Sequence, residues 1–380
     1  MKKIKYVALS KSALQADQPL LFPIHNRQGR LIAEKDAVLS STQLKEILEL
    51  AEIFTPSQAL KSALGTAGEN DISKAIDKLM RPHQRLSNIE RILQSVSEHP
   101  SSKTAASKIF ASISRLQSVC KKTPSAAIAK VITDSNDNYT VRHALHTAIL
   151  CELAAIQLKW PSEKRHDLVG AALTMNLSLG FMQDELLDQA RPLSQDQKLI
   201  IHNHPLDSVK MLQEIGIQNT EWLHYVEKHH ETADGTGYPK GCHQNNIPLG
   251  ASLINLSDVY CAKVSGRNYR DAIYANVATR DIFLEKDNTS KDTLIDVFVK
   301  TLGLYPPGCY VRLKNKEFGI VVKRGKHINA PLVRLISENA SEPIVSNIFR
   351  QVDDKKYAIQ EIVPIDSNNF KVNYNIIWDY

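Results

Sequence analysis

Residues 229–239 read His-His-Glu-Thr-Ala-Asp-Gly-Thr-Gly-Tyr-Pro and form the most informative stretch of the chain. Two adjacent histidines end an apolar-periodic segment, and a glycine-rich turn follows them. Neighbouring side chains on a helix point about 100° apart, so both imidazoles can reach one site only near a helix end or at the edge of a metal cluster. Gly235 and Gly237 allow positive φ, and Pro239 fixes the exit of the turn. Composition alone is equally compatible with a helix end that carries two solvated histidines.

Other potential metal ligands lie on both sides of this stretch. His143 begins an earlier apolar helix pattern, His204 precedes a proline, and Asp258 lies within a later apolar segment. Four histidines and a carboxylate on different helices of one bundle are the raw material of a metal site. Each of them taken singly is more often a structural residue than a ligand, so the prediction depends on the whole set.

The first 135 residues divide into two regions with different sequence patterns. Residues 1–60 contain strand-like runs, including one at 20–24, a turn signal at 26–30 and a capped helix start at 41–44. This pattern predicts a small α/β N-terminal unit. Residues 61–135 combine helical periodicity with polar breaks, which predicts a helical connecting region.

The C-terminal half divides near a Tyr-Pro-Pro-Gly break at 305–308. Residues 136–303 carry helical periodicity with almost no alternating strand pattern, which predicts a helical domain. Residues 304–380 contain three short β-like runs separated by turns, at 310–313, 319–322 and 332–336. They predict a small β-rich C-terminal module on a chain that is mainly α.

The composition limits the classes of protein to which this chain can belong. The 380 residues are 43% hydrophobic and 23% charged, which is ordinary for a globular protein of two or three domains and excludes a collagen-like or wholly disordered chain. A net charge of +6 gives no reason to expect DNA binding. We find no apolar run of roughly 18 residues that could span a membrane and no secretory signal. Five scattered cysteines without a CxxC pair are typical of a reducing cytoplasm, where we expect this protein.

The stretch at 229–239 resembles HHExxDGxGYP, a hallmark of the HD-GYP family, which is a branch of the HD superfamily of helical metal-dependent phosphohydrolases. Shorter segments at 247–249, 258–260 and 267–270 resemble further family motifs in the same order. The resemblance covers residues from about 139 to about 303. It implies an HD-type helical bundle core in a bacterial signalling protein, and cyclic di-GMP, a bacterial second messenger, as the ligand.

The resemblance also implies roles for individual residues. The positions that match the metal ligands of the family are His143, His204, His229, His230 and Asp258. The positions in segments that line its substrate pocket are Gly237, Tyr238, Pro239, Arg267 and Arg270. Family members hydrolyse cyclic di-GMP with two, sometimes three, metal ions that a carboxylate bridges.

This sequence departs from the family at its namesake His-Asp dyad. Met175 and Asn176 occupy the dyad positions, and Leu179 replaces the lysine that follows. A neutral asparagine is a poor substitute for a bridging carboxylate, and methionine offers only a soft thioether. A two-metal clamp is therefore not expected, and no residue receives a catalytic role. His166 and Asp167, the nearest His-Asp pair, are interpreted as a solvated turn in a polar linker.

Two functions follow from this departure. The first is a signalling protein of weak or lost phosphodiesterase activity that acts as a cyclic di-GMP-related sensor or as a module for a protein partner in the same network. The second is an active metal-dependent cyclic di-GMP phosphodiesterase that uses the retained histidines. Three histidines can hold one divalent ion, iron, manganese or zinc, and a metal-free site is the other alternative. A scaffold that binds neither metal nor nucleotide is a third hypothesis.

Overall fold

The computed structural model divides the chain into two compact units, Met1–Arg85 with Val372–Tyr380, and Leu86–Lys371. The residues that it describes are 6–10, 13–50, 52–63, 80–134, 138–180, 182–189, 191–265, 273–284, 291–337, 348–353, 355–364 and 377–378. Among these residues, no helix combines the length and the apolar character that crossing a bilayer requires.

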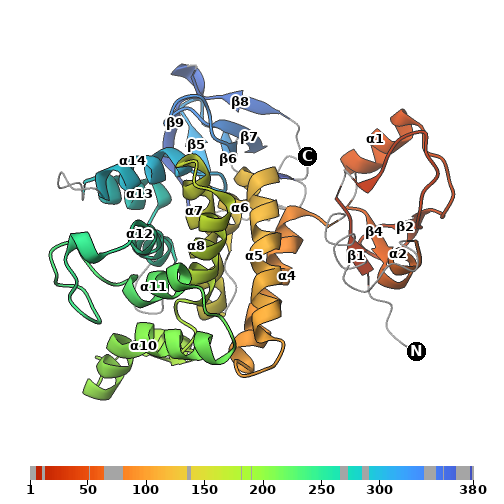
Figure 1. The fold of residues 1–380 in the computed structure, drawn as a ribbon. Coiled ribbons are helices and arrows are strands. Elements are labelled where there is room, and N and C mark those ends of the chain that lie inside the picture. Colours follow the sequence, from red (N-terminus) through yellow and green to blue (C-terminus); the bar gives the residue numbers. More distant parts are fainter. Residues whose placement is uncertain are drawn as a thin grey trace. The chain divides into compact units, whose positions relative to one another are not determined.

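The first unit is a small α/β fold built on a four-stranded antiparallel sheet (Figure 1). Its elements are β1 (Tyr6–Ala8), β2 (Ile24–His25), β3 (Leu31–Ala33), α1 (Ser41–Leu50), β4 (Phe54–Pro56) and α2 (Ser57–Ala63), with strand order β1-β4-β2-β3. The predicted turn at 26–30 is confirmed, because Asn26 Oδ1 accepts hydrogen bonds from two backbone N–H groups of that turn. The strand expected at 20–24 is wrong before Ile24. Leu20 instead exchanges backbone hydrogen bonds with residues 36 and 37, which form no strand.

The second unit is a helical bundle. Its helices are α4 (Pro82–Glu98), α5 (Ala105–Lys122), α6 (Pro124–Thr133), α7 (Tyr139–Gln157), α8 (Ser162–Thr174), α9 (Met182–Asp188), α10 (Gln195–Glu214), α11 (Thr220–Lys228), α12 (Leu249–Val264), α13 (Ala275–Leu284) and α14 (Lys291–Leu302). Nearly every residue of α7 is buried, as expected of a helix that is apolar around most of its circumference. Helix α7 packs against α5, α6, α8, α12 and α14, and so forms the centre of the bundle (Figure 1). The predicted fold class, mainly α with small terminal α/β and β-rich parts, is confirmed.

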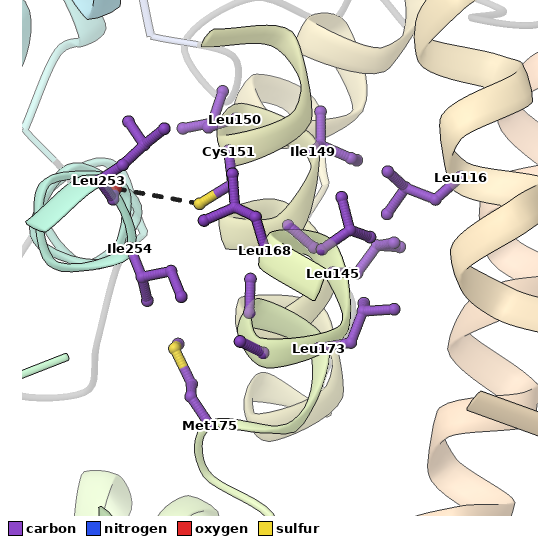
Figure 2. Packing of buried hydrophobic residues seen from close by; sticks show 14 of the residues in the cluster. Leu116, Leu145, Ile149, Leu150, Cys151, Leu168, Leu173, Met175, Leu253 and Ile254 are labelled. Atoms are coloured by element: carbon purple, nitrogen blue, oxygen red, sulfur yellow. Dashed lines mark hydrogen bonds between the residues drawn. The ribbon is translucent and has the colours of Figure 1, made fainter. Parts of the chain in front are cut away.

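The apolar core joins α7, α8 and α12. Leu145 and Ile149 of α7, Leu168 of α8 and Ile254 of α12 are fully buried in one cluster (Figure 2). Met175, at the end of α8, belongs to the same cluster and is also fully buried. A side chain at this position therefore contributes to packing as well as to any neighbouring polar site.

A five-stranded antiparallel sheet ends this unit. Its strands are β5 (Tyr310–Leu313), β6 (Phe318–Lys323), β7 (Leu332–Ser337), β8 (Phe349–Gln351) and β9 (Ile359–Ile362), in the order β8-β7-β6-β5-β9. The three predicted β-runs are thus confirmed as β5, β6 and β7. Val311, Val321 and Val333, from three neighbouring strands, are buried in one cluster with Ala275 of α13. Helix α13 therefore covers part of one face of the sheet.

Gly170 allows α8 to pack closely against α11. A Cβ atom built at position 170 would lie 2.5 Å from the indole ring of Trp222. That ring is buried, and its Nε1 donates a hydrogen bond to Thr174 Oγ1 at 3.0 Å, which holds the indole against α8. The position therefore has no room for a larger side chain.

We expect Gly170→Ala to lower the free energy of unfolding by about 1–3 kcal/mol, because the added methyl group displaces the indole of Trp222. The better helix propensity of alanine offsets up to about 1 kcal/mol of that cost. Urea denaturation measures the difference. In a Trp222→Leu background, which makes room for the methyl group, the cost should shrink, and an equal cost in both backgrounds would contradict the packing explanation.

A buried ionic cluster joins α4, α6 and α7. Lys130 Nζ lies 3.0 Å from Glu90 Oε1 and 2.6 Å from Asp134 Oδ2, and His146 Nε2 lies 3.3 Å from the same Asp134 oxygen. Burial raises the pKa of Glu90 to about 7, although the ammonium group of Lys130 opposes the shift. Burial also lowers the pKa of His146 to about 4, although Asp134 opposes that shift. Lys130 is therefore the cation that balances this cluster at neutral pH.

Lys130→Met should cost about 3–5 kcal/mol at pH 7, because it leaves buried carboxylates uncompensated. The loss should grow as the pH rises. The pKa of Glu90 in the folded chain already lies above its ordinary value of 4.5, and it rises further without Lys130. Above pH 4.5 the unfolded chain therefore releases the Glu90 proton while the folded chain retains it, and the folded state loses stability as the pH rises. Urea denaturation at pH 5 and pH 8 tests this. The double variant Lys130→Met with Glu90→Gln should recover part of the stability at pH 8, and an equal loss at both pH values would refute the charge explanation.

Candidate metal centre

His229 and His230 follow the last residue of α11 and come together at the helix end. Their ring centroids are 4.1 Å apart, which the divergent directions of adjacent helical side chains would not allow further inside a helix. Asn219 caps the start of α11 by accepting a hydrogen bond from the Trp222 backbone N–H at 3.0 Å. From α12, the Asn255 side-chain amide donates to the His229 carbonyl oxygen at 2.9 Å and fixes that residue from the other side.

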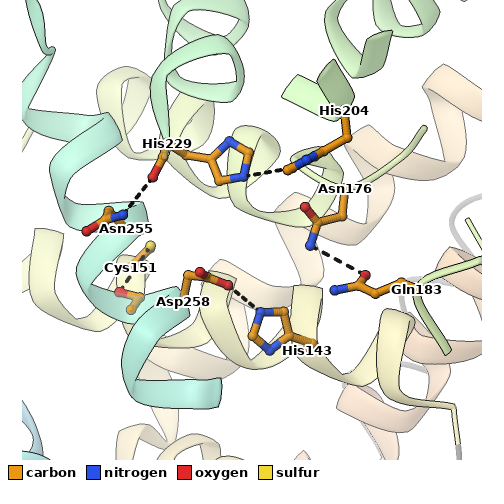
Figure 3. A network of polar contacts seen from close by, with 9 residues as sticks. His143, Cys151, Asn176, Gln183, His204, His229, Asn255 and Asp258 are labelled. Carbon is orange, nitrogen blue, oxygen red and sulfur yellow. Dashed lines mark hydrogen bonds and ion pairs between the residues drawn. The ribbon is translucent and has the colours of Figure 1, made fainter. Parts of the chain in front are cut away.

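His204 of α10 and His229 face each other, and each ring presents its Nε2 atom to the other. In each ring Nδ1 donates to a backbone carbonyl oxygen three residues earlier, at 2.6 Å for His204 and 2.7 Å for His229. The two Nε2 atoms lie 3.3 Å apart (Figure 3). Two ligands on one tetrahedral ion, each at about 2.0–2.1 Å, are separated by roughly the same distance. The two nitrogens are thus spaced as two ligands of one ion would be.

The electrostatics of this pair favour a metal ion over a proton. Burial lowers the pKa of His204 to about 3, and the neighbouring His229 contributes to that shift. Burial likewise lowers the pKa of His229 below its ordinary value. Both rings are therefore neutral at pH 7, and with Nδ1 carrying the proton each Nε2 presents a lone pair to the other. A bound cation would remove that repulsion, and a carbonyl partner on Nδ1 is the usual arrangement behind a histidine ligand.

His230 completes a group of three. A ligand atom from each of His204, His229 and His230 lies within 4.8 Å of the other two. Burial lowers the pKa of His230 well below its ordinary value, and the nearby His229 adds to the shift. The Tyr238 ring stacks on His230, with centroids 4.6 Å apart and planes at 22°, and so restricts the orientation of that imidazole. The three neutral imidazoles fit a borderline divalent ion such as zinc, iron or manganese.

His143 and Asp258, the other two predicted ligands, form a pair of their own. His143 Nε2 of α7 lies 2.5 Å from Asp258 Oδ1 of α12 (Figure 3). Burial opposes ionisation of Asp258, but the hydrogen bond and charge of His143 outweigh it and hold the pKa of that carboxyl well below its usual range. Asp258 also lies within electrostatic range of His204, His229 and His230. The structure therefore divides the five predicted ligands into a group of three and a hydrogen-bonded pair.

Asn176 lies between His204 and His143 in Figure 3. Its Nδ2 donates to Gln183 Oε1 at 3.5 Å. Its Oδ1 is buried and accepts no hydrogen bond from any residue that the structure describes. A buried oxygen without a donor is costly, so this oxygen marks a place where a cation, water or ligand donor would be stabilised. The neighbouring dyad position, Met175, points instead into the apolar core, with its sulfur beside Ile254 (Figure 2).

Two acidic residues of the 229–239 stretch hold its loop. Glu231 accepts hydrogen bonds from the backbone N–H groups of Lys240 and Cys242, both at 2.7 Å. Asp234 accepts bonds from both Thr232 Oγ1 and Thr236 Oγ1, at 2.7 and 2.8 Å, and these bonds lower its pKa to about 2. The sequence had given neither carboxylate a role, although an aspartate between two threonines is a recognisable turn signal.

The glycines of the loop serve different purposes. Gly235 has a φ of +77°, as predicted. Gly237 does not use the positive φ that glycine allows. A Cβ atom there would lie 2.4 Å from the Thr232 backbone nitrogen and 2.5 Å from the His230 carbonyl oxygen, and this close approach requires glycine. Pro239 follows Tyr238 in the same loop.

The remaining predicted residues lie elsewhere. Leu179 is buried near the end of the turn that follows α8. Arg267 and Arg270 fall outside the described residues. The interpretation of His166 and Asp167 as a turn in a polar linker is wrong, because both lie within α8. His166 stacks on Phe110 with centroids 5.8 Å apart, and this contact with α5 holds the segment in the bundle.

Comparison with known proteins identifies the family. A family model described as an HD domain matches residues 89–292, more than half of the chain. The chain belongs to the HD domain family. This membership confirms the resemblance to the HD superfamily that the sequence indicated.

Relatives of this HD domain protein include named phosphodiesterases. It is 28% identical over 227 residues to a cyclic di-GMP phosphodiesterase of Pseudomonas aeruginosa, covering 59% of this chain and 55% of that protein. It is 22% identical over 203 residues to the cyclic di-GMP phosphodiesterase PdeB of Borreliella burgdorferi, covering 53% of each. It is 29% identical over 147 residues to a 3'3'-cGAMP-specific phosphodiesterase of Vibrio cholerae, covering 38% of this chain and 33% of that protein. The chain thus spans about half the length, or less, of these curated relatives.

A solved structure resembles the chain as well. It is an HDG"Y"P protein from Bdellovibrio bacteriovorus, with a TM-score of 0.48 and 16% sequence identity. The likeness covers 77% of this chain and 98% of that one.

Proposed function

We propose that this HD domain protein is a cytoplasmic signalling protein that binds cyclic di-GMP or a related cyclic dinucleotide and hydrolyses it slowly or not at all. Its site would hold one divalent ion on His204, His229 and His230. The observation that carries the proposal is the contrast between three neutral histidines spaced for one ion and the uncharged amide of Asn176, which lies between His204 and His143 in Figure 3. The names of the relatives support a cyclic dinucleotide as the ligand.

The histidines of the site can bind without rearrangement. The carbonyl oxygens that accept from Nδ1 of His204 and His229 fix both tautomers and leave each Nε2 free. When bound, a divalent ion would polarise a phosphoryl oxygen and lower the pKa of its bound water to about 7. The bound cation would attract the anionic phosphodiester.

Efficient hydrolysis requires more than these residues supply. A two-metal mechanism stabilises the attacking and the leaving oxygen together, and it needs an anionic group to bridge the ions. Asn176 is neutral, and Asp258 is already engaged with His143. If the second ion contributes about 4 kcal/mol, its loss slows the reaction roughly a thousandfold. Binding without efficient turnover suits a sensor, or a module that recruits a protein partner of the same network.

The alternative is an active metal-dependent phosphodiesterase. The observation that favours it is the same group of three histidines, since one ion with open positions can still activate water. The two functions predict the same ligand and differ in the rate of turnover.

Metal analysis, calorimetric titration with cyclic di-GMP and a hydrolysis assay in Mn²⁺ and Fe²⁺ test the proposal together. We expect about one equivalent of metal, saturable nucleotide binding and little product. Linear product formation with one or two equivalents of metal, abolished by His229→Ala, would establish the enzyme instead. A protein that binds neither metal nor nucleotide would be a scaffold, and both functions would be refuted.

A further inference from the structure

The rings of His202, Tyr238 and His230 form a continuous stack beside the candidate metal centre. The Tyr238 ring lies 4.6 Å from His230 with planes at 22°, and 5.4 Å from His202 with planes at 25°. His230 in turn lies 4.1 Å from His229. The stack therefore runs from His202, an exposed residue of α10, inward to the three histidines.

This stack limits how a nucleobase can meet the site. One face of a phenol ring has room for one closely stacked ring, so the two nearly parallel imidazoles cover opposite faces of Tyr238. Tyr238, which the family resemblance places in the substrate pocket, cannot then offer either face to a base. His202 lies at the outer end of this stack and is exposed, so among the described rings of the stack its outer face is the one open to a further ring.

We propose that His202 is a base-stacking residue of this site and that a purine base of the cyclic dinucleotide stacks on its outer face. This inference rests on the proposed function, since it requires a cyclic dinucleotide at the metal centre. A nucleotide held in this way places a phosphodiester toward the three histidines and a base over the outer imidazole. Aromatic side chains are sequence-tolerant platforms for bases because every base has a π-face. Tyr238 then acts as a positioning residue, because its ring stacks on the inner face of His202.

The test compares dissociation constants for cyclic di-GMP in the full-length protein, the His202→Ala variant and the His202→Phe variant. We expect His202→Ala to weaken binding roughly 5- to 150-fold, the factor that corresponds to about 1–3 kcal/mol of stacking. His202→Phe keeps an aromatic face and should bind within about threefold of the unaltered protein. His224→Ala, which removes an exposed histidine of α11, is the matched control and should change nothing.

A ligand without bases separates stacking from a general effect on the site. Affinity for inorganic phosphate, measured in the metal-loaded protein, should be the same before and after His202→Ala. Unchanged cyclic di-GMP binding by His202→Ala would show that His202 holds no base, and tighter binding would show that it covers the site. Either result would overturn this inference alone. An equal loss of phosphate and dinucleotide affinity would also overturn it. Absence of cyclic di-GMP binding by the unaltered protein would overturn the proposed function as well.

Discussion

Asn176→Asp combined with Met175→His will raise the metal content from about one to about two equivalents and the rate of cyclic di-GMP hydrolysis by roughly a thousandfold. Position 176 already places a buried oxygen that accepts no hydrogen bond from the described residues, between His204 and His143 in Figure 3. A carboxylate there adds the negative charge that two divalent ions need. Elemental analysis and initial rates in Mn²⁺ measure the two effects.

The single variant Asn176→Asp separates charge from packing. Met175 is fully buried in the apolar core, so Met175→His introduces a polar ring there and carries a stability cost of its own. Asn176→Asp alone should increase metal content while leaving that core intact. It should also make the metal-free protein less stable than the unaltered one, because an unpaired carboxylate is then buried.

Asn219→Asp is a control of matched charge. It adds one negative charge at an exposed helix cap, where aspartate caps as well as asparagine does. It should alter neither metal content nor rate. If the double variant at 175 and 176 behaves like this control, the missing dyad does not explain the weak activity that we propose.

His229→Ala will abolish metal-dependent stabilisation of the protein. An ion present at about a thousand times its dissociation constant stabilises the folded state by about 4 kcal/mol, and a chelator removes that contribution. The unaltered protein should therefore lose several degrees or more of its melting temperature when the metal is removed. His229→Ala should melt at the same temperature with and without metal, because the ring that faces His204 at 3.3 Å is gone.

The comparison with and without metal matters because His229 is also fully buried. Its removal leaves a cavity and lowers the melting temperature in both conditions. Only the difference between the two conditions reports on metal binding. His224→Ala should retain the full difference, and a chelator effect that persists in His229→Ala would place the ion elsewhere.

Much of the fold follows from local sequence patterns. Residues with helical spacing, such as Leu145 and Ile149, predicted α7, and the β-runs at 310–313, 319–322 and 332–336 appear as strands. The prediction at 20–24 was wrong before Ile24 because Leu20 and Phe22 lie in a loop and still pack into the hydrophobic core of the first unit. Burial alone does not distinguish a strand from a packed loop, since both hide the same side chains.

The sequence by itself determined which residue types are available to the site: two histidines beside a glycine-rich turn, a third histidine at 204, and no acid at 176. Those facts depend on identity and order along the chain. Only the tertiary structure decided that His204 and His229, 25 residues apart, present lone pairs at 3.3 Å, and that His143 and Asp258, 115 residues apart, pair with each other. It likewise placed Tyr238 between two imidazoles. The reason is that helical periodicity depends on neighbours within a few residues, whereas desolvation and ring orientation depend on distant helices that meet only in the folded chain.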